Sequence, residues 1–188
     1  MSLKYTKIPT DTFETLQVNG GMLVETFVPA TGVYTNQLGA ISGGISFTAQ
    51  PSFVDYGEDI DNCPKNTKEL MMLDDWTITV SGTYKTIKKD TIVRNIGLAD
   101  IDSTDTTKIV PRNEIDLEND FHDLWILGDY GREGGFVAVH LMDAMSTGGF
   151  QWQTTDKGKG DFAFEYTAHY SIDAQDTVPF EVYLVDSE

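Results

Sequence analysis

The run from Phe162 to Tyr170 constrains the fold more than any other part of this sequence, because apolar and polar residues alternate along it. The even-numbered positions are Phe162, Phe164, Tyr166, Ala168 and Tyr170, and the odd-numbered positions are Ala163, Glu165, Thr167 and His169. Successive side chains of a strand point to opposite faces of a sheet. The run therefore predicts a strand whose aromatic face covers a core and whose other face meets solvent.

A second alternating run comes just before it. Phe150 and Trp152 alternate with Gln151 and Gln153, and the connection 155–160 contains two glycines. Two alternating runs around a glycine-rich connection predict a hairpin, with Phe150 and Trp152 on the core face. We interpret Lys157-Gly158-Lys159-Gly160 as its turn rather than as an anion site.

Further strands are predicted along the whole chain, at Phe13–Val18, Met22–Phe27, Ile45–Ala49, Trp76–Tyr84, Phe136–Met142 and Phe180–Leu184. Asn19-Gly20-Gly21 is expected to be a hairpin turn between the first two, and Pro51 is expected to end the third. Phe136–Met142 is apolar at both parities, which predicts a central strand covered on each side. For Phe121–Tyr130 the pattern leaves both helix and strand open.

One clear helix is predicted, at Lys88–Ala99, with Asp90 as its cap. Its apolar stripe would be Ile92, Val93, Ile96 and Ala99. About eight strands and one helix predict a mainly β fold: a β-sandwich or barrel of antiparallel strands with one flanking α-helix. The 188 residues suit a single domain, 1–188, with an N-terminal arm and a long loop at about 53–75.

That long polar connection is the first candidate functional segment. Loops of this length are uncommon in compact domains and are usually functional or interaction segments. A short helix over Thr67–Leu73 is possible inside it, since Asn66 and Glu69 have the spacing of a capping box. We expect the segment to contact a neighbouring subunit, because apolar residues interrupt an acidic stretch. The candidate contact residues are Tyr56, Glu58, Asp59, Ile60, Asp61, Leu70 and Met71.

The net charge of −17, from 13 basic and 30 acidic residues, excludes one class of function. No Lys or Arg occurs between Lys7 and Lys65, and none follows Gly160. Proteins that bind nucleic acid tightly do so by releasing counterions to Lys and Arg. This chain should repel polyanions instead, although simple solubility also accounts for such a charge.

Patterns of catalysis and metal binding are missing from the sequence. There is no G-x-S-x-G, H-E-x-x-H or Walker A motif. His122, His140 and His169 lie in separate segments, and Cys63 has no base near it in sequence. The clusters Asp59-x-Asp61 and Asp100-x-Asp102-x-x-Asp105 offer oxygens that a hard cation such as calcium could use, but they lack the glycine and the final glutamate of an EF-hand loop. We therefore interpret them as solvated loop acids. We expect no enzyme activity, no cofactor and no metal.

Membrane insertion and secretion are not expected either. No apolar run approaches the ~18 residues of a membrane helix. The N-terminus has no apolar signal region, and the lone Cys63 forms no intrachain disulfide, which suits a cytoplasm.

Four blocks of the sequence resemble the major tail proteins of long-tailed bacteriophages and prophages. They are Tyr56–Leu70, Trp76–Gly82, Phe121-x-x-Leu124-Trp125-x-x-Gly128-Asp129-Tyr130, and Ser146–Asp176. The last block is the most specific, and the resemblance covers nearly the whole chain.

The resemblance implies a structural virion protein that is made in the bacterial host cytoplasm and ends in the phage tail. In that family a β-sandwich with a flanking helix assembles into hexameric rings, which stack around a tape-measure protein and later pass double-stranded DNA. The family has no catalytic residues. An acidic tube would let DNA slide without tight binding, and Glu165, on the wet face of its strand, is the candidate lumen-facing residue.

Two other classes of function have less support in the sequence. A β-sandwich binding module of a phage tail, for carbohydrate or a host receptor, would need exposed aromatic residues, and Trp152 or Trp125 could serve. The predicted core position of Trp152 argues against it. An enzyme has no constellation of residues behind it.

Overall fold

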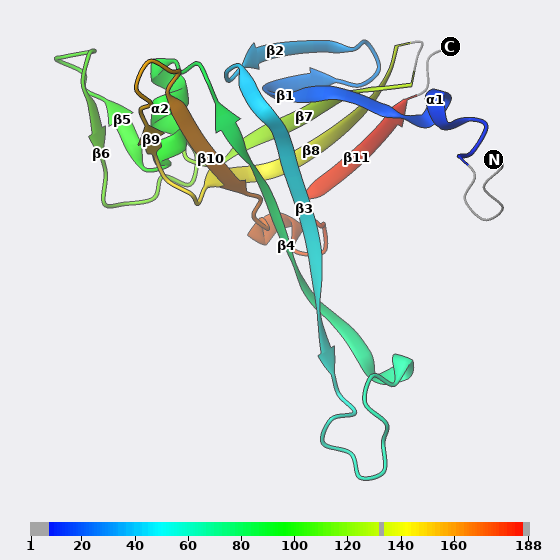
Figure 1. Cartoon of the computed structure of the whole chain (residues 1–188). Helices are drawn as coiled ribbons and strands as arrows, with labels where there is room; N and C mark the ends of the chain where they lie inside the picture. The colour runs from blue at the N-terminus through cyan, green and yellow to red at the C-terminus, as the bar shows by residue number, and fades with distance from the viewer. Residues whose placement is uncertain (1–7, 132–133, 186–188) are drawn as a thin grey trace.

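The structure is a computed structural model that describes residues 8–131 and 134–185 (Figure 1). The segment 1–7 of the predicted N-terminal arm lies outside the described residues. The strands are β1 (Gln17–Val28), β2 (Val33–Gln37), β3 (Ile41–Asp55), β4 (Met71–Tyr84), β5 (Ala99–Ile101), β6 (Ile109–Pro111), β7 (His122–Tyr130), β8 (Gly135–Ser146), β9 (Gln151–Gln153), β10 (Asp161–Thr167) and β11 (Phe180–Val185). The helices are α1 (Thr12–Thr15), α2 (Lys89–Ile96) and the 3₁₀ turns η1 (Lys68–Leu70) and η2 (Ile172–Ala174).

The strands form two antiparallel layers that face each other. One layer has the order β2-β1-β7-β8-β11, and the other has the order β9-β10-β4-β3. The two layers are continuous, because Tyr166 and Thr167 of β10 pair with the end of β8. β5 and β6 form a separate two-stranded sheet beside α2 (Figure 1). This mainly β, sandwich-like architecture with one sizeable helix confirms the predicted fold class.

The main core lies between the layers and confirms the pattern of β10. Phe164, Tyr166 and Ala168 are buried, whereas Glu165 between them is exposed. They pack with side chains of both layers, including Leu23, Ile78, Val80, Tyr84, Leu124 and Leu141. The strand ends at Thr167, and Tyr170 is exposed rather than in the core.

Strand β8 has a core on each of its faces, as predicted for Phe136–Met142. Val139 and Leu141 belong to the main core. Ala138 points to the opposite face and packs in a second cluster with Val24, Phe27, Trp125 and Leu127. No residue of this strand is exposed.

The hairpin β9–β10 is present, but the predicted core position of Trp152 is wrong. Its side chain is 64% exposed, and Phe150 is 38% exposed. β9 has three residues and pairs only with β10, so it lies at the edge of its layer, where the facing layer provides no cover. The Trp152 ring stacks on Phe162 with the ring centroids 6.2 Å apart.

Two predicted breaks are not breaks. β1 runs straight through Asn19-Gly20-Gly21, where Val18 faces Asp129 but Met22 already faces Leu127. The positive φ values of Asn19 (67°) and Gly21 (73°) form a bulge there, and not a turn. β3 likewise continues past Pro51, which is tolerated because β3 is the outermost strand of its layer.

Other expectations are corrected in detail. Phe121–Tyr130 resolves as the strand β7, and the predicted strand Phe13–Val18 is replaced by the turn α1 and the start of β1. The helix predicted at Thr67–Leu73 is only the 3₁₀ turn η1, because Asn66 has a φ of 60° and the chain becomes extended again from Met71.

Helix α2 is shorter than the predicted Lys88–Ala99. Its N-cap position is Lys88 rather than Asp90, without a side-chain capping bond, and Gly97 ends it with a φ of 84°. The residues it buries most are Thr91 and Asn95, not the predicted apolar stripe. The Thr91 hydroxyl donates to the carbonyl of Leu38 at 2.7 Å, and the Tyr166 hydroxyl donates to the Asn95 side chain. Polar bonds from the sandwich therefore fix the helix in place.

Candidate functional site

A long two-stranded ribbon projects from the body of the molecule (Figure 1). β3 and β4 pair from Ile41 opposite Tyr84 out to Asp55 opposite Met71. The loop predicted at about 53–75 is therefore shorter, because Phe53 and Val54 pair with Leu73 and Met72 in the ribbon. We call residues 51–75 the arm and residues 56–70, between the strand ends, the tip loop.

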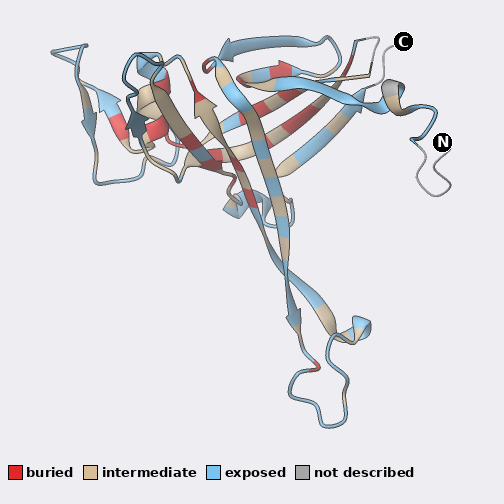
Figure 2. Cartoon of the chain, in the orientation of Figure 1, coloured by how far each residue is buried: buried red, intermediate tan, exposed pale blue. Residues whose placement is uncertain are grey.

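The arm carries large apolar side chains that no layer of the sandwich covers (Figure 2). Their exposed fractions lie between 38% and 61% for Phe53, Val54, Tyr56, Ile60, Met72 and Leu73. Exposed apolar residues that occur singly are normal, but a group of six on one projection is typical of an interaction site.

The tip loop has an ordered interior. The Asp55 carboxylate accepts the backbone N–H of Gly57 at 2.8 Å and that of Asn66 at 2.9 Å. These bonds, with Asn66 first, lower the pKa of the Asp55 carboxyl. Gly57 is buried where a Cβ would lie 2.9 Å from Leu70 Cδ1 and 3.0 Å from the Cys63 sulfur. The loop is thus folded on itself, while Tyr56 and Ile60 point outward.

The predicted contact residues all lie on this arm. Tyr56, Glu58, Asp59, Ile60 and Asp61 are exposed in the tip loop, and Leu70 and Met71 are half-buried at its base. The Glu58 carboxylate forms an exposed ion pair with Lys65 at 3.3 Å. The Cys63 sulfur lies 3.6 Å from the Thr67 hydroxyl, inside the loop.

Glu165, the predicted lumen residue, lies on the open outer face of β3, β4 and β10. The register places it opposite Ser81, which is opposite Ser46. The neighbouring positions on this face carry hydroxyl and amide groups: Thr48, Gln50, Thr77, Thr79, Thr83 and Thr167. β3, β4 and β10 contain no Lys or Arg. The strands of this face are therefore polar and contribute no cation, and Lys85, directly after β4, is paired with Asp161 of β10.

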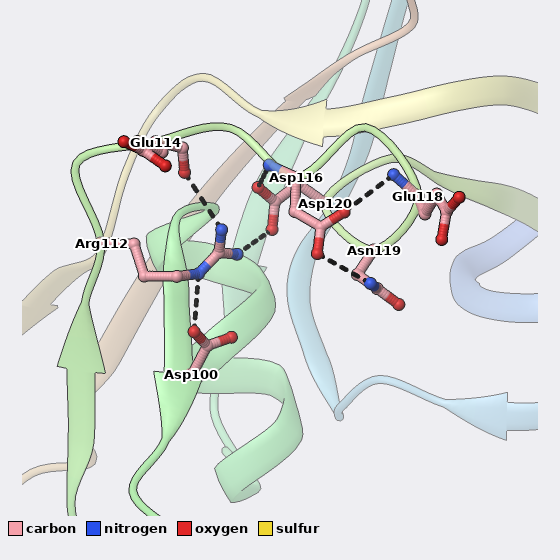
Figure 3. Close-up of polar contacts among 7 residues, drawn as sticks. All are labelled: Asp100, Arg112, Glu114, Asp116, Glu118, Asn119 and Asp120. Atoms are coloured by element: carbon pink, nitrogen blue, oxygen red, sulfur yellow. Dashed lines mark hydrogen bonds and ion pairs between the residues drawn. The ribbon is translucent and has the colours of Figure 1, made fainter.

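An arginine cluster closes the polar connection between β6 and β7 (Figure 3). Arg112 pairs with Asp100 at 2.7 Å and with the buried Asp120, and it donates to the Glu114 carbonyl at 3.0 Å. The other Asp120 oxygen accepts the N–H of Asp116 at 2.7 Å. The hydrogen bond with Asp120 raises the pKa of Arg112 above its usual range. The carboxylates of Asp100 and Asp120 thus already have partners within the chain, and the cluster stabilises the loop between β6 and β7.

The remaining acids of the connection 100–120 stabilise turns. Asp102 Oδ1 accepts the N–H groups of Thr104 at 2.8 Å and Asp105 at 3.1 Å, and bonds from Thr104 lower the pKa of the Asp102 carboxyl. Within 8–131 and 134–185, no group of three or more His, Cys, Asp or Glu residues has a metal-binding arrangement.

The three histidines lie in different surroundings. The His140 ring stacks on the buried Trp125 at 4.1 Å, and its Nε2 lies 3.2 Å from Asp123. His169 Nδ1 lies 3.2 Å from the Asp143 carbonyl. His122 lines a hollow beside α2 together with Arg94, Arg112 and Asp120. Burial first, and then the charge of Arg94, lowers the pKa of His122, while Glu25 and Asp120 oppose this.

Acid is therefore expected to destabilise the fold through His122. In the unfolded chain the His122 ring takes up a proton near its ordinary pKa of about 6.5, which is higher than its pKa in the folded state. The contribution of neutral His122 to the free energy of unfolding is fully present above the unfolded pKa and is lost as the pH falls through the folded pKa. The loss is at most about 1.4 kcal/mol per pH unit. Urea unfolding at pH 7.5, 6.5 and 5.5 should show a steeper decline for the parent chain than for His122→Gln. Equal declines would contradict this role of His122.

No protein-family model and no curated protein matches the sequence. None of the helices among the described residues is long and apolar enough to cross a membrane.

Proposed function

We propose that this chain is a tail tube subunit of a long-tailed bacteriophage or prophage, which self-assembles into stacked hexameric rings. The observation that carries the proposal is the arm, because it places six exposed apolar side chains outside the body of the subunit. Burying them against another copy removes apolar surface from water, which stabilises the contact by about 25 cal/mol for each Å² buried. The sequence resemblance and the acidity support the same assignment.

In this proposal the tube surrounds a tape-measure protein during assembly and later conducts double-stranded DNA from the virion. The outer face of β3, β4 and β10 suits a wall along which DNA moves. Its strands offer hydroxyl groups and the carboxylates of Glu165 and Asp161 and contain no Lys or Arg, and Lys85, directly after β4, is paired with Asp161. The chain is made and assembled in the host cytoplasm, and no catalytic step is involved.

Electron microscopy of the purified protein over a concentration series tests the proposal. Rings about one subunit thick, or tubes with a regular repeat, are expected at high concentration. A protein that stays monomeric at all concentrations, in the presence and absence of the tape-measure protein, would refute it.

Replacing Glu165 by lysine should leave rings intact and slow DNA ejection. The substitution puts a cation on the proposed DNA path in every subunit, and each contact with phosphate is worth on the order of 1 kcal/mol in water. The defect should ease as salt rises, since charges further apart than about 10 Å are screened at 0.1 M. Ejection rates are compared with those of Glu118→Lys, which makes the same charge change at an exposed position of the connection between β6 and β7. Equal ejection rates for the two variants would show that Glu165 does not face the lumen.

One observation favours the second candidate function, a carbohydrate- or receptor-binding module. Trp152 is 64% exposed and lies with Phe150 and Phe162 at the edge of a layer, whereas Trp125 is buried. Exposed aromatic rings can stack on sugars or on a receptor. Titrating the chain with a panel of methyl hexopyranosides and following tryptophan fluorescence tests this, because Trp152→Ala should abolish any change that the sugars cause.

A further inference from the structure

A hollow lies between the β1–β2 hairpin and the outer face of β7 and β8. It has a volume of about 490 Å³. Its lining includes the side chains of Met22, Phe27, Tyr34, Leu127 and Phe136, together with six glycines, the amides of Asn19 and Gln37 and the exposed carboxylate of Asp129. Hollows of this size with apolar walls and a few polar groups are typical binding sites.

The electrostatics of this hollow favour a cationic occupant. β1, β2, β7 and β8 contain no Lys or Arg, so the strands that build the hollow provide no partner for a bound anion. The Asp129 carboxylate is oriented by a hydrogen bond from the Asn19 side chain. Aromatic rings around a carboxylate suit a lysine side chain, whose stem is apolar and whose ammonium group is attracted by both.

A matching group of cations lies elsewhere on the same chain. The turn between β9 and β10 presents Lys157 and Lys159, which are both exposed. Neither forms an ion pair with another described residue, in a chain of net charge −17. Lys157 has a φ of 55°, a left-handed conformation that is common in turns.

The turn belongs to one layer and the hollow to the outer face of the other. Figure 1 shows β9, β10 and α2 at one side of the body, and the far end of the β1–β2 hairpin at the other. Because the turn and the hollow lie on different surfaces, a contact between them would join two copies of the chain. A contact between two different surfaces of the same chain is heterologous, and repeating it gives a ring or a filament.

We propose that the Lys157–Lys159 turn of one subunit docks into the Asp129 hollow of its neighbour. This inference rests on the proposed function, because it names the surfaces through which copies associate. It differs from the arm, since it uses the opposite face of the first layer and depends on charge. Association through it should weaken as salt rises.

Complementary variants test the contact. The turn variant Lys157→Glu/Lys159→Glu and the hollow variant Tyr34→Ala/Asp129→Lys should each associate at least about tenfold more weakly than the parent chain, because a close charge pair is replaced by like charges. A mixture of the two retains one intact contact, between the hollow of the turn variant and the turn of the hollow variant. In the other contact of the mixture the charges of the turn and of the hollow are both reversed, so these surfaces still attract each other, without the Tyr34 ring. Analytical ultracentrifugation should therefore show that the mixture forms heterodimers or longer alternating assemblies that neither variant forms alone. The control Lys88→Glu/Lys108→Glu makes the same charge change on two other exposed lysines and should associate as the parent does.

A peptide experiment separates this inference from the tube proposal. A cyclised peptide of residues 151–163 is added to the parent chain, and amide NMR shifts are recorded with a peptide carrying glutamate at both lysines as control. Selective shifts around Asp129 and Tyr34 would support the docking even if the parent chain formed no tubes. If tubes form but the turn variant assembles like its control, the docking is wrong and the tube proposal stands. If the peptide causes no shifts and the mixture gives no heterodimer, the docking is overturned. If the variant with Asp129→Lys fails to fold, Tyr34→Ala alone replaces it as the hollow variant, because Tyr34 is half-exposed and its substitution should not prevent folding.

Discussion

Replacing Val139 by aspartate is expected to lower the free energy of unfolding by about 3–5 kcal/mol, the range measured when a buried charge is left without a partner. Val139 is 8% exposed in the middle of β8 and belongs to the main core. Its neighbours in the register are Ile126 on β7 and Val182 on β11, so neither side offers a partner for the carboxylate. A loss of this size is a large part of the stability of an ordinary domain.

The matched control is the same substitution on the next strand. Val182 lies directly opposite Val139, but it is 57% exposed on the edge strand β11. Val182→Asp should change the stability by no more than about 0.5 kcal/mol. Chemical unfolding of both variants measures the difference. If Val139→Asp unfolds at the same denaturant concentration as Val182→Asp, then β8 is not the covered central strand described here.

The burial of strands β8 and β10 was predictable from the sequence, because the periodicity of apolar residues reports directly on which faces of a strand are buried. In β10 the alternation of Phe164 and Tyr166 with Glu165 matches their burial, and in β8 the apolar residues at both parities match two cores. Such patterns fail at the edges of a layer. Trp152 alternates as a core residue does, but its strand has no layer facing it, and nothing in the local sequence indicates the extent of the opposite layer.

Local turn signals were ambiguous for a similar reason. Asn19-Gly20-Gly21 has the residues of a tight turn, but residues with positive φ also form bulges, and the pairing of β1 with the distant β7 decides between the two. For α2, the sequence indicated a helix but not its buried residues. Thr91 and Asn95 are buried because Leu38 and Tyr166, from other parts of the chain, provide hydrogen-bonding partners.

The candidate sites were predictable to different degrees. The arm was predicted as an interaction segment from its length and from Ile60, Leu70 and Met71, although the strands extend further into it than expected. The hollow at Asp129 was not predicted. Its lining residues come from 19–37, 127–129 and 134–136, and the pairing of β1 with β7 brings these segments together.

Deleting Tyr56–Asn66 from the tip loop is expected to leave the thermal melt nearly unchanged and to abolish tube formation. The loop makes its hydrogen bonds within the arm, as between Asp55 and Gly57, and none of its residues belongs to either core cluster. Its removal therefore costs the body of the subunit little, while the proposed contact between copies loses Tyr56 and Ile60.

Point variants separate the loss of apolar contact from the loss of backbone. Tyr56→Ser/Ile60→Ser removes two side chains that are 61% and 52% exposed, and the control Ile115→Ser/Leu117→Ser removes two that are 53% and 78% exposed on the body. Both pairs should melt within a few degrees of the parent, since surface substitutions usually change stability by no more than about 0.5 kcal/mol. Only the arm pair should fail to give tubes in electron micrographs, because apolar anchors near the centre of an interface contribute most of its binding energy. Tubes of normal length from the deletion variant would show that copies associate without the tip loop, and the six exposed apolar residues of the arm would then need another partner.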